Sequence, residues 1–91
     1  MIETTITVTN RSGLHARPAK EFVEKVREFK SKVTIQNLSR PNTKEVPVSA
    51  FQLLQLGVRQ GHEVRLRADG EDEAAAIAAL RKLIEDNFSE F

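Results

Sequence analysis

The sequence predicts an α+β domain in which helices cover one face of a mostly antiparallel, four-stranded sheet. Two observations lead to this prediction. Four segments have the alternation or composition of strands, and three have apolar residues at helical spacing. Their order is βαββαβα. The chain has 91 residues without repeats or a linker, so we expect residues 1–91 to form a single domain.

The strands are identified by alternating apolar and polar residues. They are expected at residues 2–9, 31–36, 44–48 and 62–68. The third contains Pro47, which has no N–H to donate and therefore belongs at an edge of the sheet. In the fourth strand, Val64, Leu66 and Ala68 should face inward.

The helices are expected at residues 16–29, 49–56 and 74–88. The first has apolar residues on one face and charged residues on the other, as a partly buried helix does. The second begins at Ser49, which with Gln52 three residues later matches a capping box. It is expected to end at Gly57, because glycine is the usual residue of a C-terminal cap. Phe88 closes the apolar stripe of the third.

Composition excludes several classes of protein. The chain contains no cysteine, so it has neither disulfides nor a thiolate metal site, and we expect no metal and no cofactor. No apolar run approaches the roughly 20 residues of a membrane span. The first residues do not resemble a signal peptide, so a cytoplasmic protein without membrane insertion is expected.

Charge is unevenly distributed although the net charge is only +1. Residues 1–44 hold nine Lys or Arg and four Glu, whereas residues 45–91 hold five Lys or Arg and nine Asp or Glu. A basic half suits an acidic protein or a phosphate. None of the five Phe lies in a basic cluster that could stack nucleobases, so no nucleic-acid partner is expected.

Residues 12–18, Ser-Gly-Leu-His-Ala-Arg-Pro, join the first strand to the first helix. Gly13 permits an unusual backbone angle, and Pro18 suits a first helical turn. A helix start offers unpaired N–H groups to an anion. His15 could act there as a nucleophile while Arg17 holds phosphoryl oxygens. Taken singly, His15 would be a polar loop residue and Arg17 a solvated one, and Gly13 and Pro18 would indicate only a turn followed by a helix. Together they indicate a phosphoryl site.

The second helix carries more apolar residues than one buried face needs. Leu53 and Leu56 can point inward, whereas Ala50, Phe51 and Leu54 lie on another side. If that side is open to solvent, it is an apolar patch of the kind that binds a partner. The alternative is that this small domain buries all of them.

Two polar residues outside the motif have simpler interpretations. Ser49 is first an N-cap hydroxyl, and its functional interpretation is a phosphorylation site at a helix start. His62 begins a strand without an acidic or basic companion in sequence, and we interpret it as structural.

The motif at residues 12–19 resembles the active-site signature of HPr, the histidine-containing phosphocarrier of the bacterial sugar phosphotransferase system. The resemblance covers essentially the whole chain and implies an open-faced β-sandwich. It implies that His15 receives a phosphoryl group on Nδ1 from Enzyme I, which phosphoenolpyruvate phosphorylates, and passes it to sugar-specific EIIA domains. Arg17 would be the charge partner of the phosphoryl group.

The same resemblance assigns roles around the second helix. Ser49 would match the regulatory serine that HPr kinase/phosphorylase modifies in some bacteria, and Ala50, Phe51 and Leu54 would match the apolar docking surface, with Lys20 beside it. Three departures stand out. Val48 replaces the usual lysine before the serine, residues 39–42 make a longer turn, and Lys20 replaces a small or hydroxylated residue.

The resemblance describes a monomeric phosphoryl carrier with a phosphohistidine intermediate rather than a stand-alone enzyme. One alternative is a regulatory relative in the nitrogen-related branch of the family, or a binding module that senses phosphorylation. Another is a small phosphatase using Arg17, but the motif offers no residue to activate water. The sequence does not name the sugar or the EIIA partner.

Overall fold

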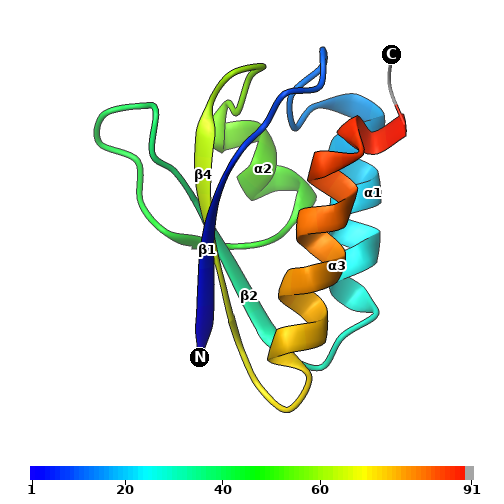
Figure 1. The fold of residues 1–91 in the computed structure, drawn as a ribbon. Helices are drawn as coiled ribbons and strands as arrows, with labels where there is room; N and C mark the ends of the chain where they lie inside the picture. Colours follow the sequence, from blue (N-terminus) through cyan, green and yellow to red (C-terminus); the bar gives the residue numbers. More distant parts are fainter. Residues whose placement is uncertain (90–91) are drawn as a thin grey trace.

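The protein folds as three helices against one face of a four-stranded sheet, which a computed structural model describes for residues 1–89 (Figure 1). The elements in chain order are β1 (Ile2–Thr7), α1 (Ala16–Arg27), β2 (Lys32–Asn37), β3 (Val46–Pro47), α2 (Ala50–Leu56), β4 (Glu63–Asp69), α3 (Glu73–Glu85) and a short 3-10 helix, η1 (Asn87–Ser89). The predicted α+β class, the order βαββαβα and the open-faced β-sandwich are confirmed.

The sheet has the strand order β1-β4-β2-β3, and every neighbouring pair is antiparallel. The last strand in sequence, β4, therefore lies between the first two. Val64, Leu66 and Ala68 of β4 are fully buried, as the alternation predicted. Pro47 lies opposite Thr34 in β3, which is an edge strand of the sheet. This confirms the prediction made from its missing N–H.

The core lies between the sheet and the helices. Helices α1 and α3 run side by side in opposite directions across the sheet (Figure 1). They bury Phe22, Leu80 and Ile84 completely against strand residues such as Ile35. Full burial of such a side chain contributes about 1.5–3 kcal/mol, so these residues hold α1 and α3 against the sheet. No helix within residues 1–89 has the length and apolar character needed to cross a membrane.

The third helix is shorter than predicted. It ends at Glu85, and the chain then turns through Asn87, Phe88 and Ser89, all with positive φ. The side chain of Phe88 is nonetheless 1% exposed. The prediction of a helix to residue 88 was wrong because Phe88 has helical spacing in the sequence but reaches the core from a left-handed backbone. The first helix likewise ends at Arg27 rather than at residue 29.

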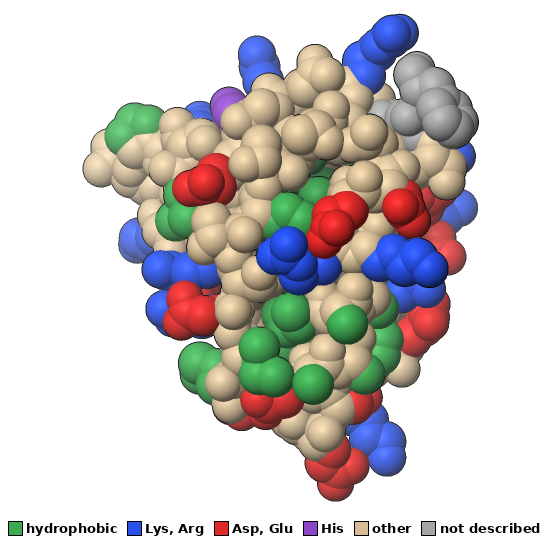
Figure 2. Space-filling model, in the orientation of Figure 1, with side chains coloured by type: hydrophobic (Ala, Val, Ile, Leu, Met, Phe, Trp, Pro, Cys, Tyr) green, Lys and Arg blue, Asp and Glu red, His purple; other side chains and the backbone are tan. Residues whose placement is uncertain are grey.

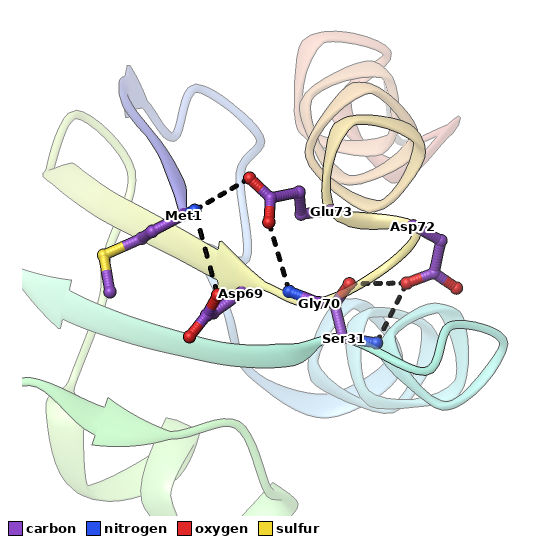
Figure 3. A network of polar contacts seen from close by, with 6 residues as sticks. All are labelled: Met1, Ser31, Asp69, Gly70, Asp72 and Glu73. Atoms are coloured by element: carbon purple, nitrogen blue, oxygen red, sulfur yellow. Dashed lines mark hydrogen bonds and ion pairs between the residues drawn. The ribbon is translucent and has the colours of Figure 1, made fainter.

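A polar network closes the end of the molecule where α3 begins (Figure 3). The Asp72 carboxylate accepts hydrogen bonds from the Ser31 hydroxyl, at 2.5 Å, and from the backbone N–H groups of Lys30 and Ser31, at 2.8 and 2.9 Å. The hydrogen bond from the Ser31 hydroxyl, followed by that from the Lys30 N–H, lowers the pKa of Asp72. This carboxylate therefore joins the α1–β2 connection to the start of α3.

The amino group of Met1 completes this network. It lies 2.9 Å from the Glu73 carboxylate and 3.8 Å from that of Asp69 (Figure 3). Glu73 also accepts a hydrogen bond from the Gly70 N–H at 3.2 Å. The bond from the Met1 ammonium lowers the pKa of Glu73, and the same bond raises the pKa of the ammonium. Both charged forms are thus favoured in the folded chain.

Candidate functional site at the start of helix α1

The loop before α1 is held in place by its backbone. Gly13 has φ +61°, and its N–H donates to the carbonyl of Asn10 at 3.2 Å. A side chain at Gly13 would collide with the carbonyl oxygen of Val58. The next residue, Leu14, is fully buried and donates its N–H to that carbonyl at 3.1 Å. Only glycine meets both demands, so the predicted turn at Gly13 has a tertiary cause as well as a local one.

His15 is the N-cap residue of α1. Its backbone is extended, its side chain is half-buried, and its ring makes no capping hydrogen bond. The N–H groups of Ala16 and Arg17 have no hydrogen-bond partner within residues 1–89, and Pro18 has no N–H. Two unpaired donors and the positive end of the helix therefore lie next to the imidazole, the arrangement that binds a phosphoryl anion.

Ala16, directly after His15, has a backbone conformation that is rare for a residue with a side chain. Its φ is +52° although it is the first residue of α1. The left-handed region costs an L-residue about 1–2 kcal/mol, and such strain persists only where surrounding contacts impose it. Leu14 and Pro18, two residues away on either side, are both buried. Nothing in the sequence signals this strain, because alanine is usual in a first turn.

Arg17 lies in the first turn of α1, but its guanidinium has partners away from His15. Nη1 is 3.5 Å from the Glu21 carboxylate, and Nη2 donates to the carbonyl of Phe88 at 3.3 Å. The Arg17 side chain is 57% exposed. An exposed ion pair contributes at most about 1 kcal/mol, so a phosphoryl dianion can compete with Glu21 for this guanidinium.

A pocket of about 470 Å³ opens beside His15. Its lining consists of His15, Arg40, Leu54, Gly57, Arg59 and His62. Sequence analysis missed this cluster, because Arg40 and Arg59 come from separate connections, β2–β3 and α2–β4. The interpretation of His62 as a residue without a basic companion holds only along the chain: in space it shares a pocket with two arginines. The longer turn at residues 39–42, which contains Arg40, was the feature of the sequence that could have pointed to this cluster.

Helix α2 shows the predicted capping at both ends. The Ser49 hydroxyl accepts a hydrogen bond from the Gln52 N–H at 3.2 Å, and Gly57 ends the helix with φ +60°. The Gln52 side chain makes no return bond to the Ser49 backbone within residues 1–89, so only half of the predicted capping box forms. Ser49 itself is partly accessible.

The apolar residues of α2 divide between core and surface. Leu53 and Leu56 are buried, whereas Phe51 is 58% and Leu54 55% exposed, and Ala50 is exposed too. The alternative in which the domain buries all of them is therefore wrong. Leu54 and Ala50 form one wall of a groove of about 590 Å³ between α2 and α1. Ala16, Ala19, Lys20, Val23, Glu24 and Arg27 line its α1 side.

The groove and the pocket meet at the same end of the molecule. Ala16 lines the groove, His15 lines the pocket, and Leu54 belongs to both. In Figure 2 the histidine seen on this face lies near the upper margin, where Lys and Arg side chains also project. Within residues 1–89 no cluster of three or more His, Asp or Glu side chains is placed to hold a metal ion.

This fold and site define a class: small open-faced sandwiches with a histidine at the start of the first helix. Residues 2–86 match the family described as the PTS HPr component phosphorylation site. The chain therefore belongs to the HPr family of phosphocarriers of the phosphotransferase system, a system of sugar transport.

Individual relatives agree with this assignment. The phosphocarrier protein HPr of Xylella fastidiosa strain Temecula1 is 38% identical over 91 residues, covering 99% of this chain and 98% of the relative. The multiphosphoryl transfer protein of Haemophilus influenzae is 43% identical over 86 residues, which are 94% of this chain but only 17% of that protein. The structure of HPr-C-His from Thermoanaerobacter tengcongensis has a TM-score of 0.91 at 42% identity, covering 100% of this chain and 99% of that one.

Proposed function

We propose that His15 accepts a phosphoryl group from Enzyme I and passes it to EIIA domains of sugar transporters. The observation that supports this proposal is the position of His15 as the N-cap of α1 with its side chain unused, beside two unpaired backbone donors. A His15 ring that capped its own helix would be less available to a phosphoryl donor. We further propose that residues 1–91 act as one monomeric domain in the cytoplasm.

The reaction needs little from the protein beyond position and charge. The lone pair on the unprotonated His15 ring nitrogen attacks phosphorus while the bond from phosphorus to the donor breaks, and its electron pair stays with the donor. We assign the attack to Nδ1. The N–H groups of Ala16 and Arg17 then face the phosphoryl oxygens, where they stabilise negative charge without rearrangement of the backbone.

Arg17 would join the phosphoryl group by leaving its resting partners. Its ion pair with Glu21 is solvent-exposed, and its second bond is to a neutral carbonyl, that of Phe88. A dianion offers the guanidinium two oxygens in the geometry of its planar donors. Only the rotation of an exposed side chain is required, so the group can bind and leave at low cost, as a carrier requires.

The groove between α1 and α2 supplies a docking surface beside His15. Ala50, Phe51 and Leu54 offer exposed apolar area, and Lys20 lies in the same groove. An apolar partner surface with acidic residues around it would complement this arrangement. Ser49 lies next to the patch, so a phosphate added there, as by an HPr kinase/phosphorylase, would change docking. Val48 stands directly before Ser49, where the resemblance to HPr implies a lysine, so we expect such a kinase to recognise Ser49 less well.

The test is reconstitution with purified Enzyme I and labelled phosphoenolpyruvate. We expect His15→Ala to take up no label and His62→Ala, the matched control, to be labelled as the wild type is. Label retained on His15→Ala would refute the assignment. Subsequent addition of an EIIA domain should remove the label from the wild type. Labelling without onward transfer to any sugar-specific EIIA would instead indicate the regulatory, nitrogen-related branch.

A further inference from the structure

We propose that the pocket beside His15 binds a small phosphomonoester without covalent attachment, held by Arg40, Arg59 and His62. The volume of about 470 Å³ lies within the usual range for small-molecule sites. This site is separate from the unpaired N–H groups and Arg17 at the start of α1, because neither Arg17 nor Ala16 lines the pocket. Of the residues in the two sites, His15 is the shared one.

The charges around the pocket favour an anion. Within residues 1–89 no acidic residue lines it. Within residues 1–89 neither Arg40 nor Arg59 has a carboxylate partner, whereas Arg17, Arg67 and Arg81 each lie within 4.0 Å of one. Arg40 and Arg59 both line this one concave surface, where the fields of two positive charges add. Their planar donors match the oxygens of a phosphate dianion.

His62 is fixed as a hydrogen-bond donor. Its Nδ1 lies 3.1 Å from the backbone nitrogen of Arg59 and 3.2 Å from Nδ2 of Asn37. The orientation of the buried Asn37 amide follows from its other bonds, since its oxygen accepts from the Ser39 N–H and Nδ2 donates to the Leu56 carbonyl. Nδ1 of His62 therefore accepts from two N–H groups and carries no proton, which leaves the proton on Nε2. Nε2 has no partner within residues 1–89.

Arg40 is held at the pocket by the turn between β2 and β3. Its Nη1 donates to the Leu56 carbonyl at 3.1 Å, and its own carbonyl accepts from the Thr43 hydroxyl at 3.3 Å. The guanidinium lies so close to Gly57 that a side chain there would meet Nη1. One of five N–H donors is used by Leu56, so the others are available to a ligand. The longer turn thus delivers a partly positioned cation.

The chemistry of the lining points to a phosphomonoester rather than a bare ion. Leu54, 55% exposed, gives the pocket an apolar wall against which a small organic group can pack. A ligand phosphate here and a phosphoryl group on His15 would repel each other, so each should weaken the binding or formation of the other. This last consequence depends on the function proposed for His15, but binding itself does not.

Binding can be tested with glycerol phosphate as the probe, at constant ionic strength, by following the imidazole NMR signals of both histidines. We expect saturable shifts of the His62 ring signals. Arg40→Gln and Arg59→Gln should each raise the dissociation constant roughly tenfold, the effect of losing one charge-assisted hydrogen bond. Arg27→Gln removes the same charge from the far end of α1 and should leave binding unchanged. Glycerol alone should not bind.

Other results would overturn the proposal. If Arg17→Gln abolished binding while Arg59→Gln did not, the anion would lie at the start of α1. Equal effects of all four arginine variants would mean nonspecific charge attraction, and inorganic phosphate binding as tightly as glycerol phosphate would mean a site for the bare ion.

In the transfer assay, glycerol phosphate should slow labelling of the wild type and not of Arg59→Gln. A wild type that binds the probe but takes up no label would refute the function of His15 and leave the pocket intact.

Discussion

The two ends of this molecule handle polar groups in opposite ways. At the end where α3 begins, Ser31 bonds Asp72 and Met1 bonds Glu73, and the pKa values of both carboxyl groups are lowered (Figure 3). At the end that carries His15, the backbone is fixed, but within residues 1–89 the His15 ring makes no capping hydrogen bond, two N–H groups at the start of α1 have no partner, and Arg40 and Arg59 have no carboxylate partner.

This difference separates stability from function. Bonded polar groups hold segments together and offer nothing to a ligand, whereas unpartnered groups contribute little to folding and remain free to bind. The end with His15 stays ordered because its backbone is held by Gly13, Leu14 and Val58 instead. Substitutions of side chains at this end should therefore change transfer, and those at the other end should change stability.

The largest expected effect comes from a substitution that disturbs the backbone conformation at the end with His15. Gly13→Ala places a side chain against the Val58 carbonyl at φ +61°, which should lower the free energy of unfolding by about 2–5 kcal/mol. Gly61→Ala is the matched control, because φ is +90° there but no atom lies within 4 Å of the added carbon. Chemical denaturation measures both, and equal losses would show that the contact with Val58 is unimportant.

Arg17 tests the prediction that side chains at this end serve transfer. Arg17→Ala should slow phosphoryl transfer by about tenfold or more through loss of a charge-assisted bond, with the melting temperature close to that of the wild type. Glu21→Gln removes the resting partner and should preserve or increase the rate. Rapid-quench transfer assays give both rates. Transfer from Arg17→Ala at the wild-type rate would contradict the role of the guanidinium.

Asp72 tests the opposite end. Asp72→Asn should lower the melting temperature by a few degrees, since three donors lose a charged acceptor, and should not change transfer. Because the pKa of Asp72 is lowered in the folded state, its stabilisation is fully present above its ordinary pKa of about 4 and is lost as pH falls through the folded value. Melts below pH 4 should therefore converge for the variant and the wild type. A constant difference at every pH would mean that the charge is not involved.

Ser49→Asp is expected to give the smallest effect, and Ser49 bears on both stability and transfer. Ser49→Asp keeps an N-cap acceptor, so the melting temperature should be unchanged or raised. Its charge beside Ala50 and Phe51 should slow transfer from Enzyme I a few-fold, less so as salt rises. Ser49→Ala, which loses the cap but adds no charge, should cost about 1 kcal/mol of stability and leave transfer intact. A transfer rate indifferent to Ser49→Asp would place docking elsewhere.

The parts of this fold that follow from local patterns could be predicted from the sequence. The alternation of apolar and polar residues predicted β4, and the Ser49 and Gly57 caps predicted the two ends of α2. Pro47 predicted that β3 lies at an edge of the sheet. Within the site, the motif predicted the position of His15 at a helix start. These features depend on residues close together in the chain, where side-chain chemistry and backbone angle are linked directly.

The remaining features depend on contacts between distant segments. Arg40 and His62 share the pocket with His15 because β2 pairs with β4 and Asn37 at the end of β2 contacts His62 just before β4. The positive φ of Ala16 and Phe88 is imposed by tertiary packing on residues that usually avoid it. A single sequence contains no local signal for either. The exposure of Phe51 was likewise undecided until its neighbours were placed.

The position of β4 in the sheet also determines when the chain can fold. Residues 63–69 pair with both β1 and β2, so residues 2–7 have their strand partner within the described chain, residues 1–89, more than fifty residues further on. Closing such a loop carries an entropic cost before any contact offsets it, and folding slows as contacts become less local. On the ribosome, the sheet therefore assembles only once β4 has emerged, and α1 and α3 gain their common support in the same late step.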